Sequence, residues 1–249
     1  MKPRLWQQRN WMLALMTWVG ILSWIPGIYY LQIGAVSPWW FVASAVTYHV
    51  IGITVSVGYH RLFVHHAFKC RPFWHWTFAL LGVLTWYGSP IQWVALHTTH
   101  HRFSDRDGDP HYTGWSYVLW KRYKPVKLDL WRTRRLLKSR FHLFVHNYYV
   151  LLALGAIAAL YLISPTLLLF GYLMPFGLLS TIGSIHVIVS HRGEGDKKEA
   201  IDLPIMEYLV PFMGEWNHGK HHREPGAWDL RMKWWHLDPG ALVIKAIRQ

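Results

Sequence analysis

The sequence is short of charge. Of its 249 residues only 16% are Asp, Glu, Lys or Arg, against about 25% in an average soluble domain. Hydrophobic residues make up 52% of the chain, which excludes a disordered protein. Cys70 is the single cysteine, so a disulfide framework is excluded as well. Tryptophan and histidine are abundant, with 17 of each, and the formal net charge is +13.

Two long stretches of the sequence carry no charged residue at all. Residues 10–60 and 141–191 contain no Asp, Glu, Lys or Arg. A membrane-spanning helix needs about 20 apolar residues, so each stretch fits two spans and a tight turn. We predict spans at about 11–31, 38–58, 147–164 and 166–186, with turns at Gln32–Pro38 and near Ser164–Pro165. No small-residue cleavage site follows the first apolar run, so we expect it to be retained as a span.

The basic residues are confined to the amino terminus, the 61–140 segment and the region after 191. Cytoplasmic loops collect Lys and Arg, so we expect both termini and a helical cap, 59–146 with 187–249, on the cytoplasmic side. A third uncharged stretch, 72–101, is interrupted by Gly88 and Pro90. We predict that it is interfacial or re-entrant, because a crossing there would put the basic segments on opposite sides of the bilayer. The sequence thus predicts a single-domain, all-α integral membrane protein, 1–249, with two helical hairpins and a cap.

A basic run extends from Lys121 to Arg140. It is either a solvated face beside anionic lipid or a docking surface for an acidic electron donor or an anionic acyl carrier. Binding to nucleic acid is not expected, because the sequence contains no nucleic-acid-binding motif.

The histidines fall into three clusters, all on the predicted cap side. The first is Gly58-Tyr59-His60-Arg61-Leu62-Phe63-Val64-His65-His66, the second is His97-Thr98-Thr99-His100-His101, and the third is His218-Gly219-Lys220-His221-His222. The last two share the spacing H-x-x-H-H, which puts three imidazoles on one face of a helix. We expect each trio to converge on one point, where neutral imidazoles holding a metal avoid the repulsion between charged rings.

The first cluster fits a regular helix less well. His60 and His65 are five residues apart, or roughly 140° around an ideal helix, so both cannot point inward from one such helix. Either the helix ends between them or His65 lies on a following turn, and His66 is a competing ligand. Without His66 the clusters offer eight ligands, more than one four-coordinate ion needs. We therefore expect two metal ions with open coordination positions.

The residues around the clusters carry a resemblance to a known family. They include Trp93 before the second cluster, Arg102-Phe103-Ser104 and Asp109-Pro110-His111 after it, and Gly214-Glu215 before the third. With the histidines and Gly58-Tyr59-His60-Arg61, this pattern resembles the three histidine boxes of the membrane fatty acyl desaturases, in the stearoyl-CoA-desaturase-like branch. The resemblance covers roughly residues 10–240.

The resemblance implies a non-haem di-iron enzyme that uses two Fe²⁺ ions, O₂ and two electrons. The ligands it implies are His60, His65, His97, His100, His101, His218, His221 and His222. For a ninth ligand after the fourth span the best match is His186, with His191 as the alternative. The family usually has an asparagine four residues before that histidine, where this chain has Ile182.

We therefore expect oxygen-dependent formation of a cis double bond, at delta-9, in a long saturated fatty acyl chain. The acyl carrier is coenzyme A, acyl carrier protein or a glycerolipid. Because the sequence contains no haem-binding His-Pro-Gly-Gly domain, we expect a separate electron donor, either a ferredoxin or cytochrome b5. Asp105, Asp109 and Glu215 are candidates for orienting the ligand imidazoles, and Trp93 is a candidate wall of the substrate tunnel.

Two other functions fit parts of the pattern. A di-iron hydroxylase of lipid, alkane or carotenoid would use similar boxes. A histidine-rich metal transporter is less consistent, because transporters place their ligands near the middle of the bilayer. We expect the bacterial inner membrane as the location, with the endoplasmic reticulum and the thylakoid as alternatives.

Overall fold

Four long apolar helices organise the protein. The computed structural model describes residues 11–111, 115–191 and 200–249, and in this part of the chain there are helices and isolated bridges but no strand. The long helices are Trp11–Gln32, Trp39–Val64, Arg140–Ile163 and Pro165–Ser190, each long and apolar enough to cross a bilayer. They confirm the predicted all-α membrane fold with two helical hairpins. The basic segment 1–10, predicted to be cytoplasmic, lies outside the described residues.

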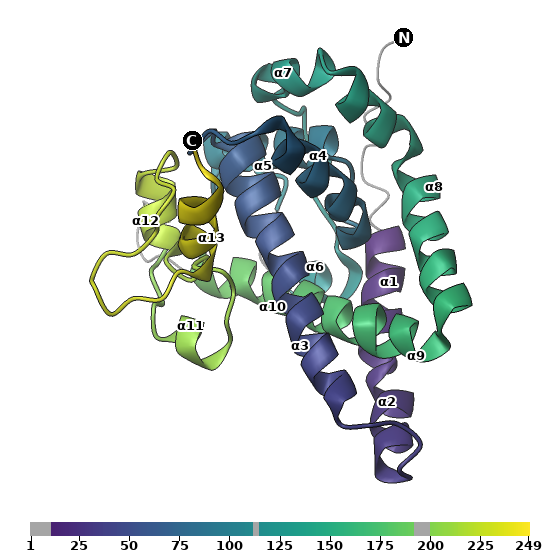
Figure 1. Ribbon diagram of the computed structural model, residues 1–249. Helices are drawn as coiled ribbons and strands as arrows, with labels where there is room; N and C mark the ends of the chain where they lie inside the picture. Colours follow the sequence, from purple (N-terminus) through teal and green to yellow (C-terminus); the bar gives the residue numbers. More distant parts are fainter. Residues whose placement is uncertain (1–10, 112–114, 192–199) are drawn as a thin grey trace.

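Three of the four long helices are made of shorter pieces. The first contains α1 (Trp11–Leu22) and α2 (Trp24–Gln32), and the second contains α3 (Trp39–Ile53) and the π-helix η1 (Thr54–Val64). The third is α8 (Arg140–Ile163). The fourth contains α9 (Pro165–Leu168), the π-helix η4 (Leu169–Leu173) and α10 (Met174–Ser190). In Figure 1 the turns that close the two hairpins lie at the lower end of the bundle, away from α4, α5 and α7.

The second and fourth helices are longer than the spans predicted from bilayer thickness. They continue from 58 to Val64 and from 186 to Ser190. The prediction was short because a helix does not have to end where the hydrocarbon ends. These extensions carry the first histidine box and the approach to His191 into the cap.

Close backbone contact joins the two hairpins. A Cβ atom on Gly20 of α1 would lie 2.6 Å from the Cα of Gly177 in α10, so only glycine permits this approach. One turn away, the hydroxyls of Thr17 and Ser180 are 2.7 Å apart. Small residues and hydroxyl pairs are the usual means by which helices associate within a bilayer.

The 72–101 stretch forms two helices instead of a span. They are α4 (Pro72–Leu81), followed by the 3₁₀ turn η2 (Gly82–Thr85), and α5 (Pro90–Phe103). Ser89 starts α5 with a capping box, in which its side chain accepts from the Gln92 amide and Gln92 reaches back to the Ser89 amide. This cap, with Pro90 in the first turn, fixes where the helix of the second histidine box begins.

The rest of the cap consists of short helices. These are α6 (Trp115–Trp120), η3 (Trp131–Thr133), α7 (Arg134–Leu137), α11 (Met206–Leu209), α12 (His218–Arg223) and α13 (Pro239–Ile247). Buried Arg61 ties this region to the second span. Its guanidinium donates to Asp238 at 3.0 Å and to the Met213 carbonyl at 2.7 Å, and Asp238 in turn caps α13 by accepting from the Ala241 amide.

A buried acid lies in the same region. Glu207 on α11 is 1% exposed. One of its carboxyl oxygens accepts from the Phe212 amide at 2.8 Å, and the other has no hydrogen-bond partner in the described structure. Burial, with the nearby charges of Asp238 and Glu215, raises the pKa of Glu207 to about 7. The carboxyl is therefore largely protonated in the folded protein below neutral pH.

This burial predicts a pH-dependent stability. The folded protein holds the Glu207 proton up to about pH 7, whereas the unfolded chain releases it near its ordinary pKa of 4.5. The free energy of unfolding should thus fall by up to about 3 kcal/mol as the pH rises through this window. Glu207→Gln keeps an acceptor and cannot ionise, so its melting temperature relative to the parent should increase between pH 5 and pH 8. Glu224→Gln, at an exposed position, is the control. Equal pH profiles for Glu207→Gln and the parent would contradict the prediction.

Candidate metal centre

Five histidines from three distant elements form the first group of imidazoles. Each offers one ring nitrogen, and these atoms lie within 4.8 Å of one another. The Nε2 atom of His221 is 2.9 Å from that of His60 and 2.9 Å from that of His101. The members are His60 at η1, His65 just after it, His97 and His101 on α5, and His221 on α12.

A second group contains four histidines whose offered nitrogens also lie within 4.8 Å of one another. The Nε2 atom of His218 is 3.0 Å from that of His191 and 3.1 Å from that of His222. The members are His100 on α5, His191 just after α10, and His218 and His222 on α12.

The two H-x-x-H-H boxes are shared crosswise between the groups. In α5 the outer pair, His97 and His101, faces the first group, while His100 faces the second. In α12 the outer pair faces the second group and His221 faces the first. This differs from the expectation that each trio converges on one point. Residues i and i+4 are 40° apart on a helix whereas i+3 and i+4 are 100° apart, so one box can serve two sites side by side.

A π-helix resolves the spacing of the first box. Residues Thr54–Val64 wind more widely than an α-helix, and the His65 amide donates to the His60 carbonyl at 3.2 Å, an i to i+5 bond. Five residues then make about one turn, so both rings reach the same side. Our estimate of 140° assumed α-helical winding, and π-helical turns of this kind are frequent at functional sites. His66 lies outside both groups, with its Nδ1 against the Leu62 carbonyl.

Of the two candidates for the ninth ligand, His191 lies within the second group and His186 does not. The Nε2 atom of His186 is 2.8 Å from the Glu215 carbonyl, so this nitrogen carries a proton and cannot ligate a metal. His186 still packs against His218, with ring centroids 4.7 Å apart, and belongs to the wall of the site. Spacing from the family pattern could not distinguish the two, because His186 lies in the last part of α10 and His191 directly follows its end. The residue four before His191 is Val187, so neither alignment supplies the asparagine.

The geometry of the two groups fits metal binding. With metal–nitrogen bonds of about 2.1 Å, two ligands at right angles around an ion are about 3 Å apart, as the closest Nε2 pairs are. Burial, and after it the neighbouring imidazoles, lowers the pKa of His97, His101, His218 and His221 well below the ordinary value. Neutral imidazoles are the form that binds metals. Both ring nitrogens of buried His65 also lack a hydrogen-bond partner in the described structure.

Three carboxylates hold the rings in place. Glu215 accepts from Nδ1 of His60 at 2.9 Å, Asp109 from Nδ1 of His100 at 3.0 Å, and Asp105 from Nδ1 of His191 at 2.9 Å. A proton fixed on Nδ1 leaves the Nε2 lone pair free for a metal.

The charge state of two of these carboxylates follows from the rings they face. Burial alone would raise the pKa of Asp109, but hydrogen bonds from His100 and His111 lower it below the ordinary value. For Glu215 the same effect of burial is outweighed mainly by His60 and Arg61, so that its pKa falls to about 2. The sequence had suggested this role for all three acids. His111, whose ring is 4.4 Å from that of His100, was named there only as part of the motif Asp109-Pro110-His111.

An internal cavity adjoins both groups. Histidines of both groups line it, together with aromatic and small side chains from the spans and the cap, among them Tyr87, Trp93, Tyr117, Tyr123 and Gly183. Trp93 stacks on His97 with ring centroids 4.6 Å apart and an interplanar angle of 9°. The candidate tunnel residue thus lines the cavity beside a ring of the first group.

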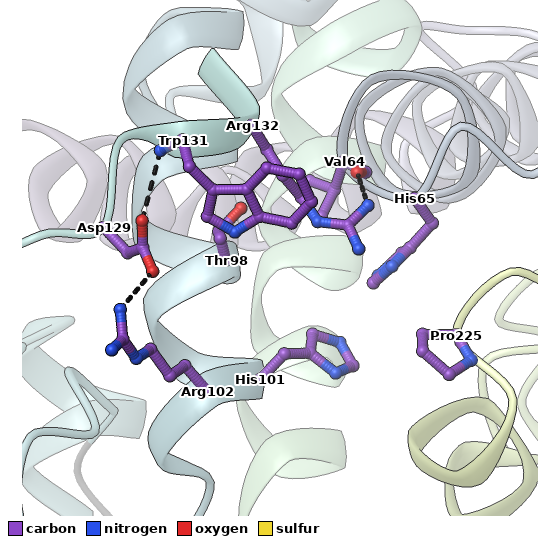
Figure 2. Close-up of a pocket in the computed structure, with 9 residues that line it drawn as sticks. All are labelled: Val64, His65, Thr98, His101, Arg102, Asp129, Trp131, Arg132 and Pro225. Carbon is purple, nitrogen blue, oxygen red and sulfur yellow. Dashed lines mark hydrogen bonds and ion pairs between the residues drawn. The ribbon is translucent and has the colours of Figure 1, made fainter. Parts of the chain in front are cut away.

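A second, more open pocket of about 530 Å³ reaches the first group from another side. Figure 2 shows the rings of His65 and His101 turned toward its centre, below Trp131. Arg102 pairs with Asp129 at 2.8 Å and Arg132 donates to the Val64 carbonyl at 2.7 Å. The polar wall of this pocket contrasts with the aromatic wall of the internal cavity.

Known proteins with similar sequences point to one family, although no family model matches the chain. The chain is 24% identical to the sn-1 stearoyl-lipid 9-desaturase of Anabaena variabilis over 248 residues, which cover 91% of each chain. It is 26% identical to the enzyme of the same name from Synechocystis sp., over 83% of this chain and 69% of the relative. Relatives of this kind, at 22–27% identity over most of the chain, support the family of membrane fatty acyl desaturases for this protein.

The family assignment extends beyond acyl-lipid enzymes. The icosanoyl-CoA 5-desaturase of Limnanthes douglasii is 28% identical to this desaturase over 84% of this chain and 61% of the relative. The resemblance carried by the histidine boxes is thereby confirmed, and the protein is an oxidoreductase.

The carboxylates generate a prediction about metal retention. Asp109→Asn and Asp105→Asn should each weaken metal binding by about 10- to 100-fold, because the ring they orient loses its fixed tautomer. Asp107→Asn is a matched control, since Asp107 is exposed in the same loop. Metal content after dialysis against a graded series of chelator concentrations measures the effect. If all three variants retained metal equally, the carboxylates would have no orienting role.

The choice between His191 and His186 can be tested directly. His191→Ala should lose the ion of the second group and retain roughly one metal ion per chain, while His186→Ala should retain roughly two. Elemental analysis of the purified, detergent-solubilised proteins gives the ratio. The reverse result would restore His186 as the ninth ligand.

Proposed function

We propose that this desaturase introduces a cis double bond, at delta-9, into a long saturated fatty acyl chain at a centre of two iron ions. The observation that carries the proposal is the pair of imidazole groups along one internal cavity. The relatives named stearoyl-lipid and palmitoyl-lipid 9-desaturases support the position of the double bond.

The reaction requires a bound metal. A methylene group in an alkyl chain has no acidic proton and no leaving group, so side chains alone cannot attack it. Iron ions held by the histidines would supply the oxidising chemistry needed to remove one hydrogen atom from each of two adjacent methylenes. In the overall balance, O₂ takes these two hydrogen atoms, two electrons and two protons, and leaves as two molecules of water.

The chain's own residues position the substrate and the metals. The nine histidines would hold the ions, His60, His65, His97, His101 and His221 at one and His100, His191, His218 and His222 at the other. Glu215, Asp109 and Asp105 keep the orientation of three of these rings. Trp93 and the tyrosines of the cavity would exclude water from the reacting carbons, which limits side reactions.

Electrons would arrive at the polar pocket of Figure 2. It brings the surface into contact with His65 and His101, and Arg102 is largely exposed at its edge. A ferredoxin or cytochrome b5 with acidic side chains near its cofactor fits such a surface.

We further propose that the cap and both termini face the cytoplasm, because the basic residues lie at that end of the spans. We also propose that the membrane is the bacterial inner membrane.

Expression in a host that lacks its own desaturase tests the function. Mass spectrometry of the fatty acids should show new monounsaturated chains with the double bond at carbon 9. His100→Ala and His221→Ala, one ligand from each group, should abolish the new product while the protein stays in the membrane fraction. Supplying saturated chains as acyl-CoA or in glycerolipid to isolated membranes distinguishes the acyl carrier.

Three results would contradict the proposal. Hydroxylated products without double bonds would indicate a hydroxylase. Freely exchanging zinc with unchanged lipids would indicate metal transport. Normal unsaturation from either histidine variant would remove that ring from the metal centre.

A further inference from the structure

Lys121 belongs to the basic run in the sequence, but its side chain is buried, unlike those of the other basic residues in the run. Its side chain is 1% exposed, whereas Arg122 and Lys127 are exposed. Its ammonium donates to the Ser180 carbonyl at 3.1 Å and to the Ser184 hydroxyl, both on α10 within the fourth span. Burial lowers the pKa of Lys121 to about 7. The run is therefore not one continuous solvated face, which was one of the two interpretations that the sequence left open.

Other polar side chains surround this amine inside an otherwise apolar bundle. Thr17 on α1 is hydrogen-bonded to Ser180 at 2.7 Å, and Tyr87 also bonds to Ser180. The cap segment reaches this depth because α6 packs against α1 and α10, with the Trp18 indole donating to the Leu119 carbonyl at 2.9 Å. We call Thr17, Tyr87, Lys121, Ser180 and Ser184 the polar plug.

The polar plug lies directly behind one wall of the internal cavity. Tyr87 belongs to both, and Gly183, between Ser180 and Ser184, lines the cavity. So do Tyr117 and Tyr123, on either side of Lys121. Along α10, Ser180 precedes the metal-group residue His191 by eleven residues, or roughly 16 Å of helix. The polar plug thus adjoins the part of the cavity wall formed by Tyr87, Tyr117, Tyr123 and Gly183.

We propose that the polar plug is the closed end of the acyl site and that Lys121 limits the length of chain the enzyme accepts. This inference rests on the proposed function. A longer chain could extend only by displacing the Lys121 amine from its acceptors, and a buried amine without acceptors is strongly unfavourable. The terminal methyl of the chain would stop at the Tyr87 and Gly183 wall for this reason.

Lys121→Met tests the proposal, because methionine has a similar length and no charge. The substitution removes the amine that donates to the Ser180 carbonyl and the Ser184 hydroxyl. These two groups keep a hydrogen bond to each other, because the Ser184 hydroxyl donates to the Ser180 carbonyl at 2.9 Å. Membranes from the desaturase-deficient host are offered equal amounts of 14-, 16-, 18- and 20-carbon saturated chains. The ratio of the longest to the shortest unsaturated product should rise at least threefold. Lys127→Met, at an exposed position, should leave the ratio unchanged.

Two further variants keep the test independent of how Lys121→Met folds. Thr17→Val removes a hydroxyl of the polar plug from α1 without changing its shape, and should shift the ratio in the same direction. Gly183→Ala should shift it the opposite way, because its methyl would lie 3.1 Å from the Tyr87 hydroxyl and 3.4 Å from Phe212. A lower melting temperature for Lys121→Met with an unchanged product ratio in both plug variants would overturn the proposal, and would make Lys121 only a structural tether.

The length of the fatty acids that co-purify with each protein tests the polar plug separately from the proposed desaturase function. Longer bound chains in Lys121→Met and Thr17→Val support the polar plug whether or not a double bond forms. A parent protein that forms no double bond overturns the proposed function. A parent that forms double bonds, beside plug variants with unchanged products and unchanged bound chains, overturns the polar plug alone.

Discussion

Nine imidazoles packed at contact distance are the constraint on which the rest of this structure depends. Rings whose nitrogens lie about 3 Å apart cannot all carry protons, so the site must stay neutral and dry until a metal binds. Burial supplies the dryness, and the three carboxylates on Nδ1 supply the orientation. Arg61 contributes to both, because it bonds Glu215 and Asp238 and so ties the end of the second span to the cap. Much of the cap can be understood as the support for these rings.

The spans could be predicted from sequence because the bilayer imposes a length. Two charge-free stretches of fixed size leave few alternatives to two hairpins, and the turns at 33–38 and Ser164 lie where they were expected. The ends of the second and fourth helices could not be predicted in this way. The charge of Arg61 ends the apolar run but not η1, which continues to Val64 packed against α5. No charge marks a comparable point in α10, which continues to Ser190 so that His191 contacts the α12 histidines.

The histidines could be found from sequence, but their grouping could not. Spacing on an ideal helix places i, i+3 and i+4 on one face, and only the arrangement of α5 against α12 decides which ring serves which ion. The π-helical winding of η1 and the choice of His191 depend on tertiary contacts in the same way. Lys121 could not be found from sequence at all. A lysine in a basic run gives no local signal that its amine is buried beside Ser180 and Ser184.

The crosswise sharing of the boxes has a consequence for how the centre forms. Because α5 and α12 each contribute rings to both groups, neither group is complete until both helices are in place. The first group also needs the end of the second span, and the second group needs the end of the fourth. A half-assembled centre with one finished metal site is therefore not available to this fold. The two ions would instead be held by one scaffold that joins the hairpins to the cap, which suits a reaction that removes hydrogen from two adjacent carbons in a fixed position.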